Sequence, residues 1–368
     1  MSLRVLVSGM ACNEPWQGGA TWAVMQYVLG LRALGHDVWF VEPVGEELDA
    51  QYVREVLRSF ELEERAAFLL EGSRRTLGVS YGRLRLQQFD AHLNVSGMLT
   101  DANLVERIPV RIYLDLDPAF NQIWHEVEGI DMRLDGHTHF ASVGQSIGSP
   151  GCPVPTCGVS WITALPLVHL ASWPRADGTD GDYTTVGHWR SYGSITAEGW
   201  HLGQRAHSMR ELLGLPARVR PRLTLALAID TGEATDLDAL ERHGWTLLDP
   251  AGAAGTPSRY RRFIQGSRAE ISIAKSGYVT SRCGWFSDRS ACYLASGRPV
   301  VAQDTGLDGA LPTGRGLLLF RDLDEAVAAI EDVESDYEEH AEAARELAVE
   351  HFDARRILRS LLEQVGLG

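Results

Sequence analysis

Residues 281–306 read Ser281-Arg-Cys-Gly-Trp-Phe-Ser-Asp-Arg-Ser-Ala-Cys-Tyr-Leu-Ala-Ser-Gly-Arg-Pro-Val-Val-Ala-Gln-Asp-Thr-Gly306. A loop that contains Gly284 leads into an expected helix through Ser287, a residue type that commonly caps helices. The helix ends at Gly297, and the apolar run Pro299–Ala302 and a second glycine loop follow it. A helix, a short buried strand and a strand-end loop in this order are typical of a parallel sheet covered by helices. The stretch therefore predicts an α/β fold.

The beginning of the chain shows the same alternation. Residues 4–10 predict a strand, residues 11–19 a loop that ends in two glycines, residues 20–35 a helix, and residues 37–41 a second strand. Further apolar runs, each bounded by polar or turn residues, lie at 89–95, 110–114 and 140–143. We therefore expect an N-terminal α/β domain over residues 1–170.

A second domain follows a segment that is typical of a linker. Residues 171–182 are rich in Pro, Gly and Asp. Beyond them strands and helices alternate again, which predicts a C-terminal α/β domain over residues 183–350. Residues 351–368 predict a last helix, because apolar side chains recur there at helical spacing.

Charge is unevenly distributed along the chain. The 368 residues carry 34 basic and 49 acidic side chains, a net charge of −15 that disfavours nucleic-acid binding. Residues 322–350 hold twelve carboxylates and one arginine, which we interpret as one solvated helical face. Residues 256–298 carry a net charge of +6, so this region suits a compact anionic ligand, although scattered surface arginines explain it as well.

Lysine occurs once in the sequence. The basic side chains are 33 arginines and Lys275, which ends the expected strand 271–275 and should project toward the cleft. An ammonium is a compact point charge, whereas a guanidinium is a planar fork. Lys275 is therefore a candidate contact for a phosphate or a sugar hydroxyl, with chance survival as the alternative.

The sequence also predicts a compartment. The N-terminal apolar run lacks the basic region and cleavage site of a secretory signal, and no stretch approaches the roughly 18 apolar residues of a membrane span. Five cysteines, of which only Cys152 and Cys157 are close in sequence, indicate reduced thiols. We expect a cytoplasmic protein with no membrane span, no metal site and no cofactor.

Loops at the carboxyl ends of parallel strands are the usual ligand sites. Gly18 and Gly19 precede a helix, where backbone amides can approach an anion or a sugar. Free amides near Ser287 and Ser290, their hydroxyls and the Arg289 guanidinium suit a diphosphate. Capping alone also explains Ser287, and a surface ion pair also explains Asp288 with Arg289. Neither a dinucleotide fingerprint nor a P-loop is present.

These segments resemble a known family. Cys283-Gly-Trp-Phe-Ser and Ala295-Ser-Gly-Arg-Pro-Val-Val-Ala-Gln-Asp-Thr-Gly are similar to the donor-binding segments of glycosyltransferases with the GT-B fold, of the family 1 and family 4 kind. The resemblance implies two Rossmann-like α/β/α domains that face each other across a cleft, with the C-terminal helix packed back on the N-terminal domain. It further implies a metal-independent hexosyltransferase-like enzyme. The C-terminal domain would bind a UDP- or dTDP-sugar, and the N-terminal domain a small-molecule or glycan acceptor.

The resemblance also nominates site residues. Val186-Gly-His-Trp-Arg190 is similar to the segment that opens the C-terminal domain of such enzymes, which makes Arg190 a candidate for the diphosphate. The full set of expected substrate contacts is Gly18, Gly19, Arg190, Lys275, Arg282, Gly284, Ser287, Asp288, Arg289, Ser290, Gln303 and Asp304. The chain departs from the family where Arg282 replaces a histidine and where no glutamate stands near Ser290. The two-glutamate pattern of many retaining members is absent too, and its places fall near Gly284 and Cys292.

Sugar transfer needs a group that activates the acceptor. Asp117, in Asp115-Leu-Asp117, follows the expected strand 110–114 and is our first candidate for the base, with His125 second. Asp-x-Asp is also the metal-binding signature of single-domain glycosyltransferases, which is the alternative interpretation. Two other functions stay open: a sugar-nucleotide epimerase of the GT-B fold, and a non-catalytic binding protein of that fold.

Overall fold

The computed structural model describes residues 2–178, 180–307 and 309–368. Its N-terminal part is an eight-stranded sheet in the order β4-β3-β2-β1-β5-β6-β7-β8, parallel except for β4. The strands are β1 (Arg4–Ser8), β2 (Asp37–Val44), β3 (Ala66–Leu70), β4 (Thr76–Gly78), β5 (Ala91–Val95), β6 (Val110–Asp115), β7 (His139–Ser142) and β8 (Trp161–Thr163). The helices are α1 (Gly18–Ala33), α2 (Ala50–Ser59), α3 (Tyr81–Arg85), α4 (Ala102–Val105) and α5 (Phe120–Glu126).

The C-terminal part is a six-stranded parallel sheet in the order β13-β12-β9-β14-β15-β16. Its strands are β9 (Tyr183–His188), β12 (Leu223–Ala228), β13 (Thr246–Leu247), β14 (Ala269–Ser272), β15 (Val300–Gln303) and β16 (Leu317–Phe320), and β10 (Ile195–Ala197) with β11 (Trp200–Leu202) forms a separate hairpin. The helices are α6 (Arg205–Glu211), α7 (Ala234–Arg242), α8 (Pro250–Ala254), α9 (Pro257–Gly266), α10 (Ser276–Ser281), α11 (Asp288–Ala295), α12 (Leu323–Ser335), α13 (Tyr337–His351) and α14 (Ala354–Gln364). A 3₁₀ turn lies at Leu215–Ala217.

The expected architecture of two α/β domains with parallel sheets is confirmed. In each sheet the strand order reverses next to the first strand, between β1 and β5 in one domain and between β9 and β14 in the other. Strands such as β1 are buried on both faces, which explains why they appear in the sequence as continuous apolar runs. The two sheets end and begin at Thr163 and Tyr183, on either side of the expected linker 171–182. Residue 179 of that linker lies outside the described residues.

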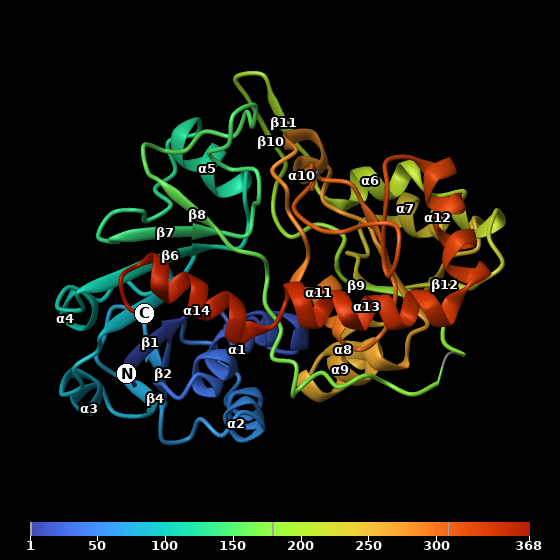
Figure 1. Cartoon of the computed structure of the whole chain (residues 1–368). Coiled ribbons are helices and arrows are strands. Elements are labelled where there is room, and N and C mark those ends of the chain that lie inside the picture. The colour runs from blue at the N-terminus through green and yellow to red at the C-terminus, as the bar shows by residue number, and fades with distance from the viewer. Residues whose placement is uncertain (1, 179, 308) are drawn as a thin grey trace.

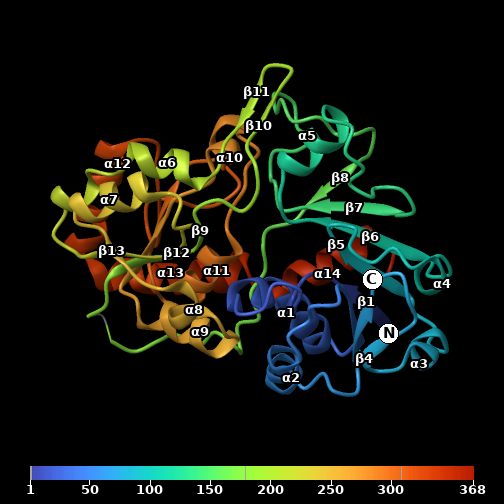
Figure 2. The same ribbon diagram turned by 180° about the vertical axis from the view of Figure 1, so that it is seen from behind.

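The domains contact each other in two places (Figures 1 and 2), and a cleft lined by residues of both domains lies between them. On one side the first turns of α1 pack against α8 and α9, where the Trp22 indole donates a hydrogen bond of 2.9 Å to the Pro257 carbonyl. On the other side the β10–β11 hairpin reaches α5, and Phe120 and Ile123 share an apolar cluster with Ile195 and Leu202. The cleft is therefore bounded at both ends by contacts between the domains.

The acidic segment 322–350 differs from the expected single solvated face. It forms two helices, α12 and α13, separated at Asp336, whose backbone is not helical and whose carboxylate accepts a hydrogen bond from the Glu339 amide. Each helix buries an apolar stripe, with Ile330 and Ala344 fully inaccessible. The interpretation failed because carboxylates dominate the composition while the intervening alanines and branched residues pack inward.

The C-terminal helix α14 packs back on the N-terminal domain, as expected (Figure 1). It lies against α1, where Gly30 approaches Ala354 and Leu358. A Cβ atom at Gly30 would lie 2.7 Å from the Ala354 Cβ and 2.6 Å from a Leu358 methyl group, closer than real Cβ contacts. Absence of a side chain at Gly30 therefore sets the distance between the two helices. Among the described residues no helix combines the length and apolarity of a membrane span.

We expect Gly30→Ala to lower the free energy of unfolding by roughly 1–2 kcal/mol, because overpacking of a tight contact costs more than alanine gains in a helix. Gly82→Ala is the matched control, since Gly82 also lies in a helix but a Cβ there would meet no atom within 4 Å. Urea unfolding of the two variants measures the difference. Equal stabilities would show that the Gly30 contact does not hold α14 in place.

Candidate functional site

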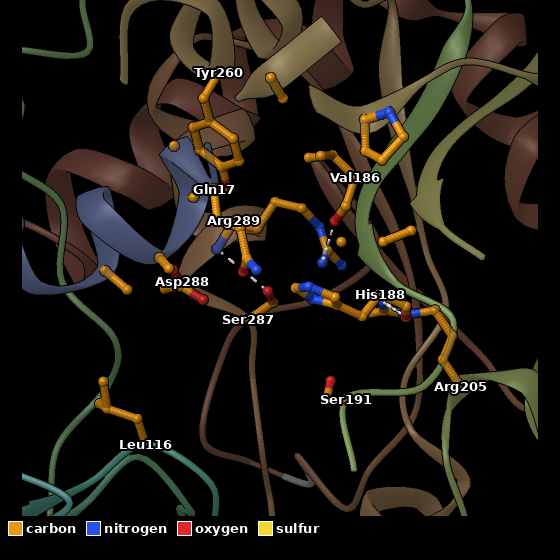
Figure 3. A pocket seen from close by; sticks show the side chains of 18 of the residues that line it. Gln17, Leu116, Val186, His188, Ser191, Arg205, Tyr260, Ser287, Asp288 and Arg289 are labelled. Carbon is orange, nitrogen blue, oxygen red and sulfur yellow. Dashed lines mark hydrogen bonds between the residues drawn. The ribbon is translucent and has the colours of Figure 1, made fainter. Parts of the chain in front are cut away.

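A cavity of about 510 Å³ lies between the two domains, at the carboxyl ends of both sheets (Figure 3). It is next to the strand-order reversal of the C-terminal sheet, where open α/β sheets usually bind ligands. The N-terminal domain contributes residues 15–20, Ala23, Leu116 and Asp117 to its walls, and the C-terminal domain contributes residues 186–188, Ser191, Arg205, Ala228, Pro250, Ala251, Ala254, Tyr260, Lys275, Tyr278, Trp285 and residues 287–289.

Arg205, the first residue of α6, brings a buried cation to the cavity wall. Its Nε donates to the Ile273 carbonyl at 2.8 Å and its Nη1 to the His188 carbonyl at 2.6 Å (Figure 3). Only 7% of the residue is exposed, and within the described ranges no carboxylate forms an ion pair with it. Burial, reinforced by the charge of Arg289, lowers the pKa of Arg205 to about 9. A buried guanidinium that lacks a carboxylate is arranged to receive an anion.

Lys275 faces Asp117 across the two domains. Its ammonium lies 3.1 and 3.3 Å from the two carboxylate oxygens. The hydroxyls of Tyr192 and Tyr278 also donate to Asp117, and the Lys275 ammonium donates to the Tyr192 oxygen. Rings surround the ammonium, with the centroids of Tyr192 at 4.1 Å and Phe120 at 5.1 Å. Burial lowers the pKa of Lys275, and the Asp117 charge opposes that shift. The predicted projection of Lys275 into the cleft is what the structure shows.

The start of α11 forms a third part of the wall. Ser287 caps this helix by accepting a hydrogen bond from the Arg289 amide. Asp288 is half-buried, and burial raises the pKa of its carboxyl group. The Arg289 guanidinium already has partners within the C-terminal domain. It pairs with the fully buried Glu270 at 2.5 Å and donates a hydrogen bond to the Val186 carbonyl at 3.0 Å. Arg289 therefore lines the cavity with its charge already compensated.

Gly18 and Gly19 line the cavity and also set the approach of the domains. A Cβ at Gly18 would lie 2.4 Å from the Thr256 carbonyl oxygen, and one at Gly19 would lie 2.8 Å from the Tyr260 ring. Larger residues would therefore push α1 away from the C-terminal domain. The close contact between the domains is therefore enough to require glycine at positions 18 and 19, whether or not these residues also contact a ligand.

Two of the expected residues with a proposed chemical role lie elsewhere. Arg190 does not line the cavity, because its guanidinium turns to Glu233 and forms an ion pair there. His125 lies on α5, and its Nδ1 accepts a long hydrogen bond of 3.5 Å from the Met132 amide. The structure brings Asp117 and Lys275 together but places neither Arg190 nor His125 beside them.

The other expected contacts serve the structure around the cavity. Asp304 accepts a hydrogen bond from the Gly306 amide and lies 3.6 Å from Arg282. Gly284 has a φ of +72°, and its carbonyl accepts a hydrogen bond of 3.1 Å from the Gln145 amide of the N-terminal domain. Ser290 and Ser272 lie side by side with hydroxyls 3.1 Å apart, and the side-chain Oε1 of Gln303 accepts from the Ala274 amide at 3.3 Å. None of these expected contacts forms part of the cavity wall.

Sequence reasoning missed several residues that the structure places at the site. Arg205 is one of 33 arginines, and nothing in its neighbours distinguishes it. Tyr192 and Tyr278 are far apart in sequence, and the fold brings both hydroxyls to Asp117. His188 lies within the Val186–Arg190 segment, whose resemblance to the family nominated Arg190 and not the histidine. Burial, together with the charges of Arg205 and Lys275, lowers the pKa of His188, which favours the neutral ring at pH 7.

The Asp115–Asp117 pair lacks the free oxygens that a metal ion needs. Asp115 accepts hydrogen bonds from Asn121, Gln122 and Ser142 and from the Asp117 amide, and burial raises its pKa. Asp117 is held by Lys275. Over the described ranges no group of three or more His, Cys, Asp or Glu side chains is placed to hold a metal ion. The alternative interpretation of Asp-x-Asp as a metal site gains no support from this geometry.

Comparisons with known proteins agree with this architecture. Residues 226–363 match the model of a family described as glycosyl transferase-like. No curated protein matches the chain in a sequence search. Among solved structures, an α-glucosyltransferase in complex with UDP aligns with a TM-score of 0.63 at 10% identity, covering 99% of this chain and 100% of that chain. HepE of Anabaena in complex with UDP-glucose aligns with a TM-score of 0.62 at 12% identity, covering 99% of each chain.

A third structure, AviGT4, a glycosyltransferase of avilamycin A biosynthesis, aligns with a TM-score of 0.57 at 14% identity, covering 99% of this chain and 97% of that chain. These alignments span both domains. The chain therefore has the GT-B fold, and the resemblance to glycosyltransferases identified in the sequence is confirmed. Several α-glucosyltransferase structures of this fold also contain DNA. Proteins of this fold can therefore bind nucleic acid. That the present protein does not bind nucleic acid stays a prediction.

We expect Lys275→Met and Asp117→Asn each to lower the free energy of unfolding by roughly 3 kcal/mol, because each leaves a mostly buried charge without its partner. The double variant should lose at least about 1 kcal/mol less than the sum of the two. The exposed pair Arg218 and Asp324, replaced in the same way, is the control and should show a coupling energy of less than about 1 kcal/mol. Additive losses at Lys275 and Asp117 would show that the pair does not hold the domains together.

Proposed function

We propose that this protein is a glycosyltransferase that transfers a sugar from a nucleoside diphosphate sugar held in the cavity between its domains. The observation that carries the proposal is Arg205, a buried cation without a carboxylate partner among the described residues, in the wall of a cavity at the strand-order reversal. The α-glucosyltransferase and HepE structures of the same fold contain UDP or UDP-glucose. These findings support a UDP-sugar or a dTDP-sugar as the donor.

The diphosphate is the leaving group, and its negative charge grows as the sugar departs. Arg205 and Lys275 are the cations that stabilise this charge, in a site where burial keeps water away. Neutral His188 and the capped start of α11 add hydrogen-bond donors beside them. This assignment replaces Arg190 with Arg205 as the arginine that meets the diphosphate, because Arg190 is paired with Glu233 outside the cavity.

The N-terminal wall is the acceptor side in this proposal. Asp117 is the candidate general base, as the sequence suggested, for a hydroxyl of a small-molecule or glycan acceptor. Its two oxygens already accept hydrogen bonds from Lys275, Tyr192 and Tyr278. Activation of an acceptor therefore requires that a bound diphosphate draws Lys275 away from Asp117. His125 receives no role, because it lies outside the cavity wall.

The same hydrogen bonds favour one alternative, a non-catalytic binding protein. If Asp117 stays saturated when a nucleotide is bound, the cavity has a ligand but no base. Turnover of a nucleotide sugar distinguishes the two functions, because a non-catalytic protein would neither transfer nor hydrolyse the sugar.

We further propose that the protein works in the cytoplasm. All five cysteines are free thiols, including Cys152 and Cys157. Unpaired cysteines are typical of reducing compartments.

Calorimetric titration with UDP, dTDP, GDP and ADP, followed by assays with the matching sugars, tests the proposed function. We expect one of the pyrimidine diphosphates to bind and its sugar to be consumed, slowly by water and faster with an acceptor present. Failure of all four nucleotides to bind would contradict the proposal.

We expect Arg205→Met to weaken nucleoside diphosphate binding roughly 10- to 100-fold, since a hydrogen bond to a charged group contributes about 1.5–3 kcal/mol. Arg210→Met is the matched control, because Arg210 lies on the same helix, is paired with Asp236 and does not line the cavity. Arg190→Met tests the assignment made from the sequence. An unchanged affinity in Arg205→Met, or a larger loss in Arg190→Met, would overturn the role of Arg205.

A further inference from the structure

Glu42 is a fully buried carboxylate that binds three consecutive backbone amides. It lies on β2, and none of its surface is exposed. Its Oε2 accepts from the Ala11 and Cys12 amides at 3.0 Å each, and its Oε1 accepts from Cys12 at 3.0 Å and from Asn13 at 2.6 Å. Within the described ranges no basic side chain forms an ion pair with Glu42. Successive amides that converge on one anion are a known way to compensate a buried charge.

These amides belong to the loop that becomes a wall of the cavity. The loop leaves β1 after Ser8, passes Glu42 at residues 11–13, and lines the cavity from Pro15 onward before α1 begins. The Thr21 hydroxyl donates to the Ala11 carbonyl at 2.6 Å. The Trp16 indole donates to Asp49 at 3.1 Å. Glu42 is the inner anchor of a loop that is held at both ends.

We propose that Glu42 is a positioning residue that fixes the loop of residues 11–17 and thereby the N-terminal wall of the nucleotide-sugar cavity. The residue does not line the cavity and acts only through the backbone that it holds. The ligand part of this inference rests on the proposed function. The order of the loop is independent of any ligand and can be measured without one.

Replacement by glutamine shows why a carboxylate is needed. Each oxygen of Glu42 serves two amides, and together they serve three. Gln has one oxygen and an NH₂ group that cannot accept, so either Ala11 or Asn13 would face a donor. An unsatisfied buried amide is costly, and the loop is expected to open locally to reach water.

The titration of Glu42 gives a second signature. Burial raises the pKa of Glu42 to about 7, and the three amides oppose this shift. The titratable groups packed around it are the Cys12 thiol of the loop and the Tyr52 phenol of α2, whose pKa values burial also raises, so both are neutral near pH 7. β3 places Phe68 opposite Glu42. The carboxylate form, which can accept from all three amides, is therefore the major form of Glu42 above about pH 7, and the hydrogen exchange of residues 11–13 should be compared at about pH 8.

Hydrogen exchange of the ligand-free protein tests the anchor directly. We expect the amides of residues 11–13 to be protected in the wild type and Glu42→Gln to reduce that protection at least about tenfold, as expected for a lost charge-assisted hydrogen bond. Glu46→Gln is the control, because it removes the same charge from an exposed position in the turn after β2. Retained protection of residues 11–13 in a folded Glu42→Gln protein would overturn the inference.

If the Glu42→Gln variant does not fold, hydrogen exchange of the wild type alone tests the inference. Residues 11–13 should exchange far more slowly than the exposed turn at residues 45–47, and equal rates would overturn the inference. Where the variant folds, one further readout separates positioning from a general loss of stability. UDP affinity should fall about tenfold in Glu42→Gln and stay unchanged in Glu46→Gln.

Unchanged UDP affinity beside lost loop protection would overturn the positioning role. If UDP binds to neither the wild type nor the variants, the proposed function fails, whereas the exchange rates still decide whether Glu42 holds the loop.

Discussion

The 3.1 Å contact between Lys275 and Asp117 joins the two halves of this molecule at the cavity between its domains. Each residue follows a strand of a different sheet, so their contact fixes how the two carboxyl edges face each other. The hydroxyls of Tyr192 and Tyr278 complete the cluster, and the β10–β11 hairpin packs on α5 beside it. The cavity exists because this cluster closes one side of the cleft while α1 closes the other.

The cavity combines charges that stability alone does not explain. Glu270 compensates Arg289, and Asp117 compensates Lys275, but Arg205 has only backbone carbonyl groups as partners among the described residues. In the proposed function, a diphosphate supplies the missing negative charge and competes with Asp117 for Lys275. Ligand binding and release of the candidate base are therefore coupled in this account through one ammonium group.

The sequence predicted the fold well, because buried parallel strands and capped helices leave local patterns such as those of residues 281–306. It also placed Lys275 and Asp117 at the ends of expected strands, and the structure brings the two side chains together in the cleft. It did not predict Arg205 or the tyrosines, because their roles depend on packing between distant segments. Arg190 was nominated by its position in a motif, and its side chain turns instead to Glu233 on the neighbouring loop. Glu42 was not predicted either, because it lies on the apolar strand β2 and its partners are backbone amides of a loop about 30 residues earlier.

A crystal structure with the bound nucleoside diphosphate tests the central claim most directly. The account predicts that oxygens of the diphosphate lie within hydrogen-bond distance of the Arg205 guanidinium and the Lys275 ammonium, with Lys275 withdrawn from Asp117. A nucleotide bound outside this cavity would contradict the account. So would a nucleotide that contacts Arg190 and makes no contact with Arg205.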